Sequence, residues 1–170
     1  IWKLRILSGS LLFGCLRRMR TLVISDIHSN SDALKAVISD AVVFDRVWCL
    51  GDVVGYGPDP NECIQILKSL PRLVCILGNH DAAVMGFIEL SAFNNEASAA
   101  IMIQERMLSQ ESREFLELLE VQRVEDGITL AHGSPRNPIW EYVMNARTAK
   151  ENFSAFDTQV CLIGHSHIPV

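Results

Sequence analysis

The sequence predicts an α/β fold. From residue 20 onward, short apolar runs alternate with longer stretches in which apolar residues recur every three or four positions. Short runs of this kind are typical of buried strands, and the longer stretches are typical of helices that cover a sheet. With 170 residues, the chain has the length of one domain and can bury a substantial core.

The first half of the chain is expected to hold three strands and two helices. Apolar runs predict strands at residues 21–25, 46–50 and 73–77. Residues 31–43 carry apolar side chains at helical spacing, and Ser31 is a suitable N-cap because its hydroxyl can accept from the first free amides. The chain therefore begins with a strand, a helix and a second strand.

The second helix has strong signals at both ends. Asp59 can cap it, Pro60 suits the first helical position, and Glu62 can reach back to the amide of the cap. Pro71 cannot continue a helix. We therefore expect this helix to cover residues 59–70.

The second half is expected to be helical first and then stranded. The predicted elements are helices at residues 92–108 and 110–119, hairpin strands at 121–124 and 128–131, a short helix at 148–153 and a last strand at 159–163. The turn Glu125-Asp126-Gly127 supports the hairpin, since Asp-Gly favours the tight turns that join antiparallel strands.

Residues 1–18 do not follow the pattern of the rest of the chain. An apolar stretch of eleven residues ends at Leu16, whereas about 20 are needed to span a bilayer. A signal peptide is the alternative, because basic residues precede the apolar stretch and Cys15 follows a short lipoprotein-like sequence. Three arginines follow at once, so we expect a non-native or disordered extension, with the domain covering residues 19–170 and no membrane association.

Charge and cysteine content limit the classes of function. The net charge of −5 lacks the broad basic surface of proteins that bind nucleic acids stably. Bound cations can still attract phosphate, so a phosphate-processing enzyme is compatible with this charge. The five cysteines show no CxxC spacing, and three of them lie in predicted strands. Buried free thiols are therefore expected, which favours the cytoplasm over an oxidising compartment.

The polar residues that could bind a metal or act in catalysis follow the predicted strands. The five histidines are His28, His80, His132, His165 and His167. Each comes just after an apolar run and beside Gly, Asp, Asn or Ser, and none is expected in a helix. Loops at the carboxyl ends of strands are where open α/β sheets bind ligands. Histidines gathered there with Asp and Asn predict a metal site.

Each loop offers a different set of possible ligands. Asp26 and His28 are two residues apart, so both can face one side, and Asp52 offers two oxygens with which to bridge two ions. Asn79 offers an amide oxygen, beside His80 and Asp81.

The loops resemble the signature blocks of a known family. In order, they read SDIHSN, GDVVGYGPDP, GNHD, AHGSP and GHSH. From Met19 to Pro169 the chain is similar to the calcineurin-like metallophosphoesterase superfamily, and closest to its small, single-domain, phosphodiesterase-like members. The resemblance implies a four-layer αββα sandwich. Relatives continue past the last block with further strands, so we expect this fold to be truncated at its C-terminal edge.

The resemblance also assigns roles to the candidate residues. The first metal would be held by Asp26, His28, Asp52 and His167. The second would be held by Asp52, Asn79, His132 and His165, with Asp52 as the bridge. His80, paired with Asp81, would stand by the leaving group as the catalytic pair. Asn79 and Arg136 would contact the substrate phosphate, although a solvated Arg136 is equally compatible with the sequence.

The implied reaction is hydrolysis of a phosphodiester or phosphomonoester by a hydroxide that bridges two divalent ions. Mixed nitrogen and oxygen ligands suit Mn, Fe, Co, Ni or Zn, and we favour Mn. The expected partner is a small phosphorylated molecule, with a nucleotide-like molecule as one candidate, and the sequence leaves the oligomeric state open. Three alternatives are a protein Ser/Thr phosphatase, a dinucleoside polyphosphate hydrolase and a non-catalytic scaffold on the same fold.

Overall fold

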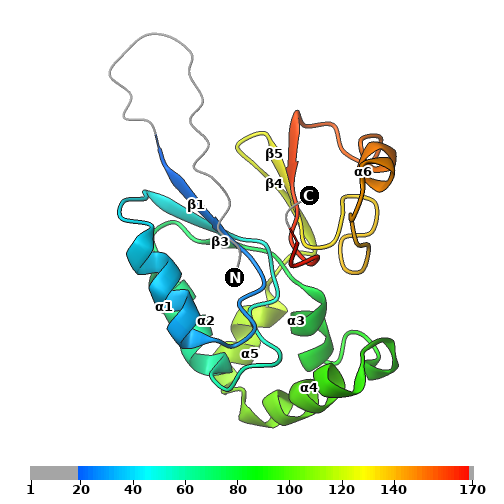
Figure 1. Cartoon of the computed structure of the whole chain (residues 1–170). Helices are drawn as coiled ribbons and strands as arrows, with labels where there is room; N and C mark the ends of the chain where they lie inside the picture. The colour runs from blue at the N-terminus through cyan, green and yellow to red at the C-terminus, as the bar shows by residue number, and fades with distance from the viewer. Residues whose placement is uncertain (1–18, 169–170) are drawn as a thin grey trace.

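Two three-stranded sheets form the centre of the fold. The computed structural model describes residues 19–168, and Figure 1 shows the two sheets side by side with helices on their outer sides. The expected N-terminal extension, with Cys15, lies outside the described residues. The other four cysteines are free, two of them buried and two half-buried.

The first sheet is parallel, and the second is mixed. Strands β1 (Thr21–Ile24), β2 (Arg46–Cys49) and β3 (Val74–Cys75) pair in this order, all parallel. In the second sheet the strands are β4 (Gln122–Glu125), β5 (Ile128–Ala131) and β6 (Val160–Leu162). There β4 and β5 form the predicted antiparallel hairpin, and β6 lies parallel to β5.

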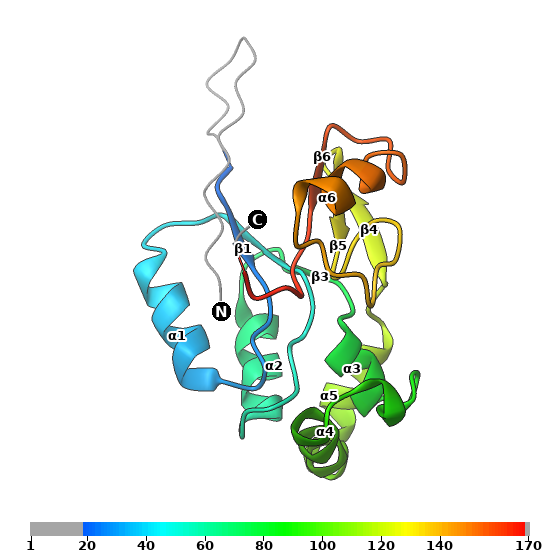
Figure 2. The same cartoon turned by 45° about the vertical axis from the view of Figure 1, so that its right-hand side comes forward.

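The helices lie on the outer sides of the two sheets and, as a separate group, at one end of them, at the bottom of Figures 1 and 2. They are α1 (Ser31–Asp40), α2 (Pro60–Ser69), α3 (Asn79–Val84), the 3-10 helix η1 (Leu90–Ala92), α4 (Asn95–Met107), α5 (Gln110–Glu117) and α6 (Ala146–Asn152). Helices α1 and α2 accompany the first sheet, whereas α6 lies on the side of the second sheet that faces away from the first. Within residues 19–168, no helix has the length and apolar character needed to cross a bilayer.

Alternation along the strands separates two apolar cores. Leu22 and Ile24 of β1 point to the core that also contains Leu34 of α1 and Ile64 of α2. The residue between them, Val23, points to the other face of the sheet. That second core unites the two sheets, since it contains Val23, Trp48, Leu50 and Ile76 from the first half together with Leu130 and Leu162. The layers are therefore helix, sheet, sheet and helix, which confirms the predicted α/β sandwich.

Two predictions about helix caps are wrong in detail. The N-cap of α1 is Asn30, whose side chain accepts from the amide of Ala33, and Ser31 is already helical. Asp59 is the N-cap of α2, but its carboxylate accepts from the Ser31 hydroxyl rather than from its own helix. Its amide donates to Ser29 instead of to Glu62. Contacts between α1 and α2 have thus replaced the local capping that the sequence suggested.

The expectation that no histidine lies in a helix is wrong for His80. The residues after β3 turn directly into α3, which begins at Asn79. Asp81 stands at the third position of this helix, and its carboxylate accepts from the amide of Gly78 at 3.0 Å. The segment is short and carries little apolar periodicity, which is why the sequence pattern suggested a loop.

Candidate metal centre

Loops from both sheets meet at one end of the fold. In the first sheet, β1 leads to Asp26 and His28, and β2 leads to Asp52. The second sheet is tied to these loops by hydrogen bonds, since the amide of His165 donates to Asp26 Oδ2 at 3.1 Å. The amide of Gly164 donates to the carbonyl of His132 at 2.8 Å. The loops that carry all the predicted metal ligands are therefore neighbours.

One group of candidate ligands contains Asp26, His28 and His167, whose donor atoms lie within 4.8 Å of one another. The Nε2 atoms of His28 and His167 are 3.0 Å apart. His167 Nε2 also lies 3.2 Å from Asp26 Oδ1. Two imidazoles and a carboxylate that converge in this way match the donor set of a transition-metal ion.

A second group contains Asp52, His132 and His165, and Asn79 lies against it. His132 Nε2 is 3.0 Å from Asn79 Oδ1, 3.2 Å from His165 Nδ1 and 3.3 Å from Asp52 Oδ2. All four side chains are buried. These nitrogen and oxygen donors form a second group that could hold a metal ion.

Asp52 lies between the two groups. Its Oδ2 atom is 3.3 Å from His132 and 3.7 Å from His28, which belongs to the other group. Its Oδ1 atom accepts from the amide of His80 at 2.9 Å, so the carboxylate is held in one orientation. Among the candidate ligands it is the one placed to contact cations on both sides.

Backbone carbonyls orient two of the histidine ligands. His28 Nδ1 lies 3.1 Å from the carbonyl of Val54, and His132 Nδ1 lies 2.8 Å from the carbonyl of Leu50. A carbonyl only accepts, so each Nδ1 carries a proton and Nε2 is the ring nitrogen that faces the other candidate ligands. Facing lone pairs repel unless a proton or a cation lies between them. The donor set therefore fits bound metal ions, and the backbone fixes the tautomer that binds them.

The backbone of the ligand loops is held in an unusual conformation. Five candidate ligands have positive φ angles: Asp26 (55°), His28 (50°), Asp52 (52°), His165 (65°) and His167 (53°). For residues other than glycine this left-handed region costs of order 1–3 kcal/mol each, and such residues cluster at functional sites. The surrounding structure thus stabilises a strained arrangement in which these side chains converge.

Glycines beside the ligands allow the loops to approach this closely. A Cβ atom on Gly78 would lie 2.1 Å from Asp52 Oδ1, and one on Gly164 would lie 2.1 Å from the hydroxyl oxygen of Ser25. Contacts this short are excluded, so any larger residue would displace the carboxylate or the loop. The glycines in the sequences GNHD and GHSH are therefore required by packing around the ligands.

Charge and burial shift the pKa values of Asp52 and His132 in opposite directions. Burial raises the pKa of Asp52, but the charge of His132 and its hydrogen bond outweigh this effect and keep that pKa well below its ordinary value. Burial lowers the pKa of His132, whereas Asp52 raises it to about 9. Without a metal, a proton on His132 compensates the buried carboxylate. A bound cation would replace that proton.

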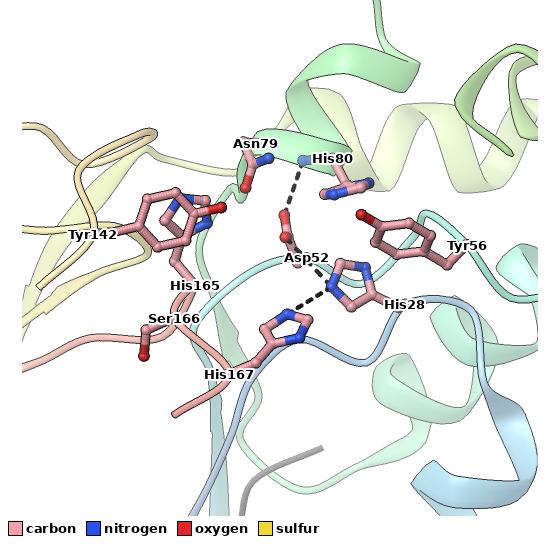
Figure 3. A pocket seen from close by; sticks show the side chains of 9 residues that line it. All are labelled: His28, Asp52, Tyr56, Asn79, His80, Tyr142, His165, Ser166 and His167. Atoms are coloured by element: carbon pink, nitrogen blue, oxygen red, sulfur yellow. Dashed lines mark hydrogen bonds and ion pairs between the residues drawn. The ribbon is translucent and has the colours of Figure 1, made fainter. Parts of the chain in front are cut away.

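The candidate ligands open onto a cavity of about 210 Å³. Its lining comprises His28, Asp52, Tyr56, Asn79, His80, Tyr142, His165, Ser166 and His167. Figure 3 shows Asp52 in the middle of this group, with the histidines and the two tyrosines around it. A small anionic substrate could reach cations bound at the base of the cavity.

Comparison with known proteins identifies the family. The sequence profile of the calcineurin-like phosphoesterase superfamily domain matches residues 19–170. The chain belongs to the calcineurin-like phosphoesterase superfamily. The crystal structure of a metallophosphoesterase from Sphaerobacter thermophilus matches this chain with a TM-score of 0.79 at 47% identity, covering 89% of this chain and 62% of that one.

Two relatives show how much of a longer protein the chain represents. An uncharacterized protein of Methanocaldococcus jannaschii is 37% identical over 155 residues, which cover 86% of this chain and 62% of that protein. A symmetrical bis(5'-nucleosyl)-tetraphosphatase of Proteus mirabilis is 28% identical over 78% of this chain and 50% of its own length. The chain thus spans less than two thirds of the length of these relatives.

The predicted pairing of His80 with Asp81 is wrong. The carboxylate of Asp81 accepts from the backbone amides of Val54 and Gly78, both at 3.0 Å. Burial and the nearby charge of Asp52 raise the pKa of Asp81 to about 7, against the effect of these two donors. Asp81 therefore joins the loop that follows Asp52 to the start of α3, and does not orient the ring of His80.

His80 lies in the cavity wall beside His28, with ring centroids 4.7 Å apart. Burial lowers the pKa of His80 to about 4, so its imidazole is neutral near pH 7. A Cβ atom on Gly55 would lie 2.4 Å from His80 Nδ1, so this glycine leaves room for the ring. The imidazole is thus placed by packing and not by a carboxylate partner.

Arg136 does not line the cavity. Its guanidinium forms ion pairs with Glu141 and with Glu151, the latter at 3.2 Å. Its amide donates to the side chain of Asn152, so the residue joins the loop after His132 to α6. This arrangement accounts for Arg136 as a structural residue, and its predicted contact with substrate phosphate stays a prediction.

Two residues at the site escaped the sequence analysis. Tyr142 stacks on His165, with ring centroids 3.9 Å apart and 24° between the rings. Gln104, from α4, is 2% exposed and accepts from the Ser29 hydroxyl and from the amide of Gly55. Neither lies in a signature block. The signal available for Gln104 was a glutamine at a position of the helix where the spacing predicts an apolar side chain.

Proposed function

We propose that this chain hydrolyses phosphate esters, either diesters or monoesters, with two divalent metal ions. The observation that carries the proposal is the pair of donor groups with Asp52 between them, 3.3 Å from His132 and 3.7 Å from His28. One isolated site would need only one such group. A carboxylate shared by two groups is the arrangement that places two cations side by side.

The chain's own residues supply binding and orientation. Asp26, His28 and His167 would hold one ion, and Asn79, His132 and His165 the other. Ions bound there would polarise the phosphoryl oxygens and lower the pKa of water, so that water could attack the phosphorus of the ester near neutral pH. The carbonyls of Val54 and Leu50 keep His28 and His132 in the binding tautomer. Mn fits the mixed nitrogen and oxygen donors, as do Fe, Co, Ni and Zn.

His80 is proposed to donate a hydrogen bond toward the leaving oxygen. It lines the cavity next to Asp52, and burial keeps its ring neutral near pH 7. Asp81 is proposed to act at a distance, by fixing the amide of Gly78 and thereby the start of the helix that carries Asn79 and His80. This replaces the catalytic pair that the sequence suggested.

The experiment is a comparison of Asp52→Asn with the unchanged chain. Protein stripped with a chelator is supplied with Mn²⁺, Co²⁺, Ni²⁺ or Zn²⁺ and assayed with bis(4-nitrophenyl) phosphate and 4-nitrophenyl phosphate. We expect activity that requires metal, two bound ions per chain, and loss of both activity and metal in Asp52→Asn.

Asp32→Asn is the matched control, because Asp32 is an exposed residue in the first turn of α1. It should keep metal content and activity. Activity that is independent of added metal, or two ions retained by Asp52→Asn, would refute the dinuclear assignment.

A dinucleoside polyphosphate hydrolase is a second candidate. It is favoured by the similarity to the tetraphosphatase of Proteus mirabilis, which extends over 78% of this chain. Diadenosine tetraphosphate belongs in the same substrate panel. If its kcat/KM is higher than that of either aryl ester, the substrate class is the dinucleoside polyphosphates and the partner is nucleotide-like.

A further inference from the structure

The cavity has few cationic groups for an anionic substrate. Among the described residues that line it, none is Lys or Arg, and Asp52 adds a negative charge. Arg136, the basic residue expected there, is engaged by Glu141 and Glu151. The Ser166 hydroxyl donates to the carbonyl of Ile168 at 2.9 Å. Phosphoryl oxygens that point away from the metal ions therefore need neutral hydrogen-bond donors.

Two phenols are placed to supply those donors. The chain contains only two tyrosines, and both Tyr56 and Tyr142 line this cavity. Figure 3 shows them on opposite sides of Asp52, each with its phenol oxygen on the side of the ring that faces the cavity. Within residues 19–168, neither phenol oxygen has a hydrogen-bond partner. The rings are 48% and 53% exposed, so a ligand can reach both.

The rings of both tyrosines are fixed by the metal-binding histidines. Tyr142 is stacked on His165, with centroids 3.9 Å apart. Tyr56 packs against His28 at 4.9 Å and against His80 at 4.8 Å. Because each ring rests on a side chain of the metal centre, the hydroxyls are held in place before a ligand arrives. Donors held in this way lose little entropy on binding.

We propose that Tyr56 and Tyr142 donate hydrogen bonds to the non-bridging oxygens of the substrate phosphoryl group, in place of a basic side chain. A phenol hydroxyl donates a hydrogen bond, so each side chain can supply one donor to a phosphoryl oxygen. The two hydroxyls approach from opposite sides and would fix how the phosphoryl group is turned above the metal centre. This inference rests on the proposed function.

The test uses Tyr56→Phe, Tyr142→Phe and the double variant of the metal-loaded protein. These changes remove the hydroxyl but keep the ring on its histidine. Hydrogen bonds to a charged partner correspond to roughly 10- to 100-fold in binding or rate. We expect kcat/KM for bis(4-nitrophenyl) phosphate to fall by about this factor in each single variant. Inhibition by inorganic phosphate should weaken in parallel, while metal content and melting temperature stay the same.

Leucine variants separate this role from aromatic stacking. If the rings stack on an aryl or nucleobase group, the Phe variants keep full activity and only Tyr56→Leu or Tyr142→Leu loses it. Phe87→Leu, at an exposed phenylalanine outside the cavity, is the control for removing an aromatic ring. Unchanged kcat/KM and unchanged phosphate inhibition in the double Phe variant would overturn the proposal.

The inference and the proposed function can fail separately. If the unchanged chain hydrolyses no ester with any ion, the proposed function fails, and calorimetric titration of inorganic phosphate into the metal-loaded protein replaces the assay. Binding that is weaker by about 10-fold or more in the double Phe variant still supports the two donors. Equal binding in variant and unchanged protein, or no binding to either, rejects them.

Discussion

At the scale of single residues, burial determines the protonation state of His80. His80 lies in the cavity wall within the group of Asp52 and His28, and burial lowers its pKa to about 4. A neutral imidazole can donate a hydrogen bond but does not carry the extra proton of a strong acid. Asp81 contacts backbone amides and not this ring, and the nearby charge of Asp52, which raises the pKa of His80, is outweighed by burial.

His80→Ala should therefore lower turnover more than it lowers metal content. We expect a loss of ~10²-fold or more in kcat with 4-nitrophenyl esters, the lower end of the range for a lost acid–base group. The loss should be smaller for esters whose leaving groups are more acidic, because they need less stabilisation of the departing oxygen. Steady-state kinetics over a series of aryl esters would measure the loss of turnover for each leaving group, and metal analysis of each preparation would measure metal content. Equal losses across the series would make His80 a residue that only positions the Asn79 loop.

The positions of the candidate ligands could be predicted at the residue scale, but their supporting contacts could not. Asp26, His28 and Asp52 stand directly after strands, so the local sequence already places them at one edge of a sheet. The partners of Asp81 depend on the path of the loop after Asp52, which no periodicity encodes. Tyr142 likewise reaches His165 only through the folding of a long loop.

At the scale of elements, α4 stabilises the site without carrying a ligand. Its Gln104 side chain accepts from the Ser29 hydroxyl at 3.1 Å and from the amide of Gly55 at 2.7 Å, and donates to the carbonyl of Gly57 at 2.6 Å. Ser29 follows His28, and the two glycines flank Tyr56. One amide group thus joins the loop after β1 to the loop after β2.

Gln104→Leu should destabilise the fold and loosen the site. The change leaves the buried Ser29 hydroxyl and the buried Gly55 amide, and the carbonyl of half-buried Gly57, without this partner, and each buried group left unpaired costs about 1–3 kcal/mol. We expect a loss of roughly 2–4 kcal/mol in the free energy of unfolding, measured by urea denaturation, together with weaker metal binding. Gln110→Leu is the control, because Gln110 is exposed and contacts only Glu114. An equal loss of stability in both variants would show that the Gln104 side chain does not specifically stabilise these loops.

The sequence anticipated the amphipathic helices and the hairpin because their apolar spacing is regular. The start of helix α3, at Asn79, was missed because the helix has only six residues, too few to show an apolar period. The function of α4 was missed for a different reason. Its contacts with the loops after β1 and β2 join residues about 50 to 75 positions apart, as the bonds to Gly57 and Ser29 show.

At the scale of the whole molecule, the candidate metal ligands come from both sheets. Asp26, His28 and Asp52 come from the first sheet, whereas His132, His165 and His167 come from the second. Outside the shared core, the strands of the two sheets are connected by an isolated bridge between Ile76 and Glu120. Cations bound between the loops would add links that the metal-free chain lacks, and binding that favours the folded state stabilises it.

Removing metal should therefore loosen the second sheet first. With free Mn²⁺ at a hundred times its dissociation constant, the folded state gains about 2.7 kcal/mol, or roughly 5–10 °C in melting temperature for a domain of this size. Hydrogen exchange should slow most in β5 and β6, since their loops carry three of the ligands, and least in α1, which lies on the opposite side of the first sheet. Asp52→Asn should show little of either effect. Equal protection of β6 and α1 on adding metal would mean that the ions do not join the sheets.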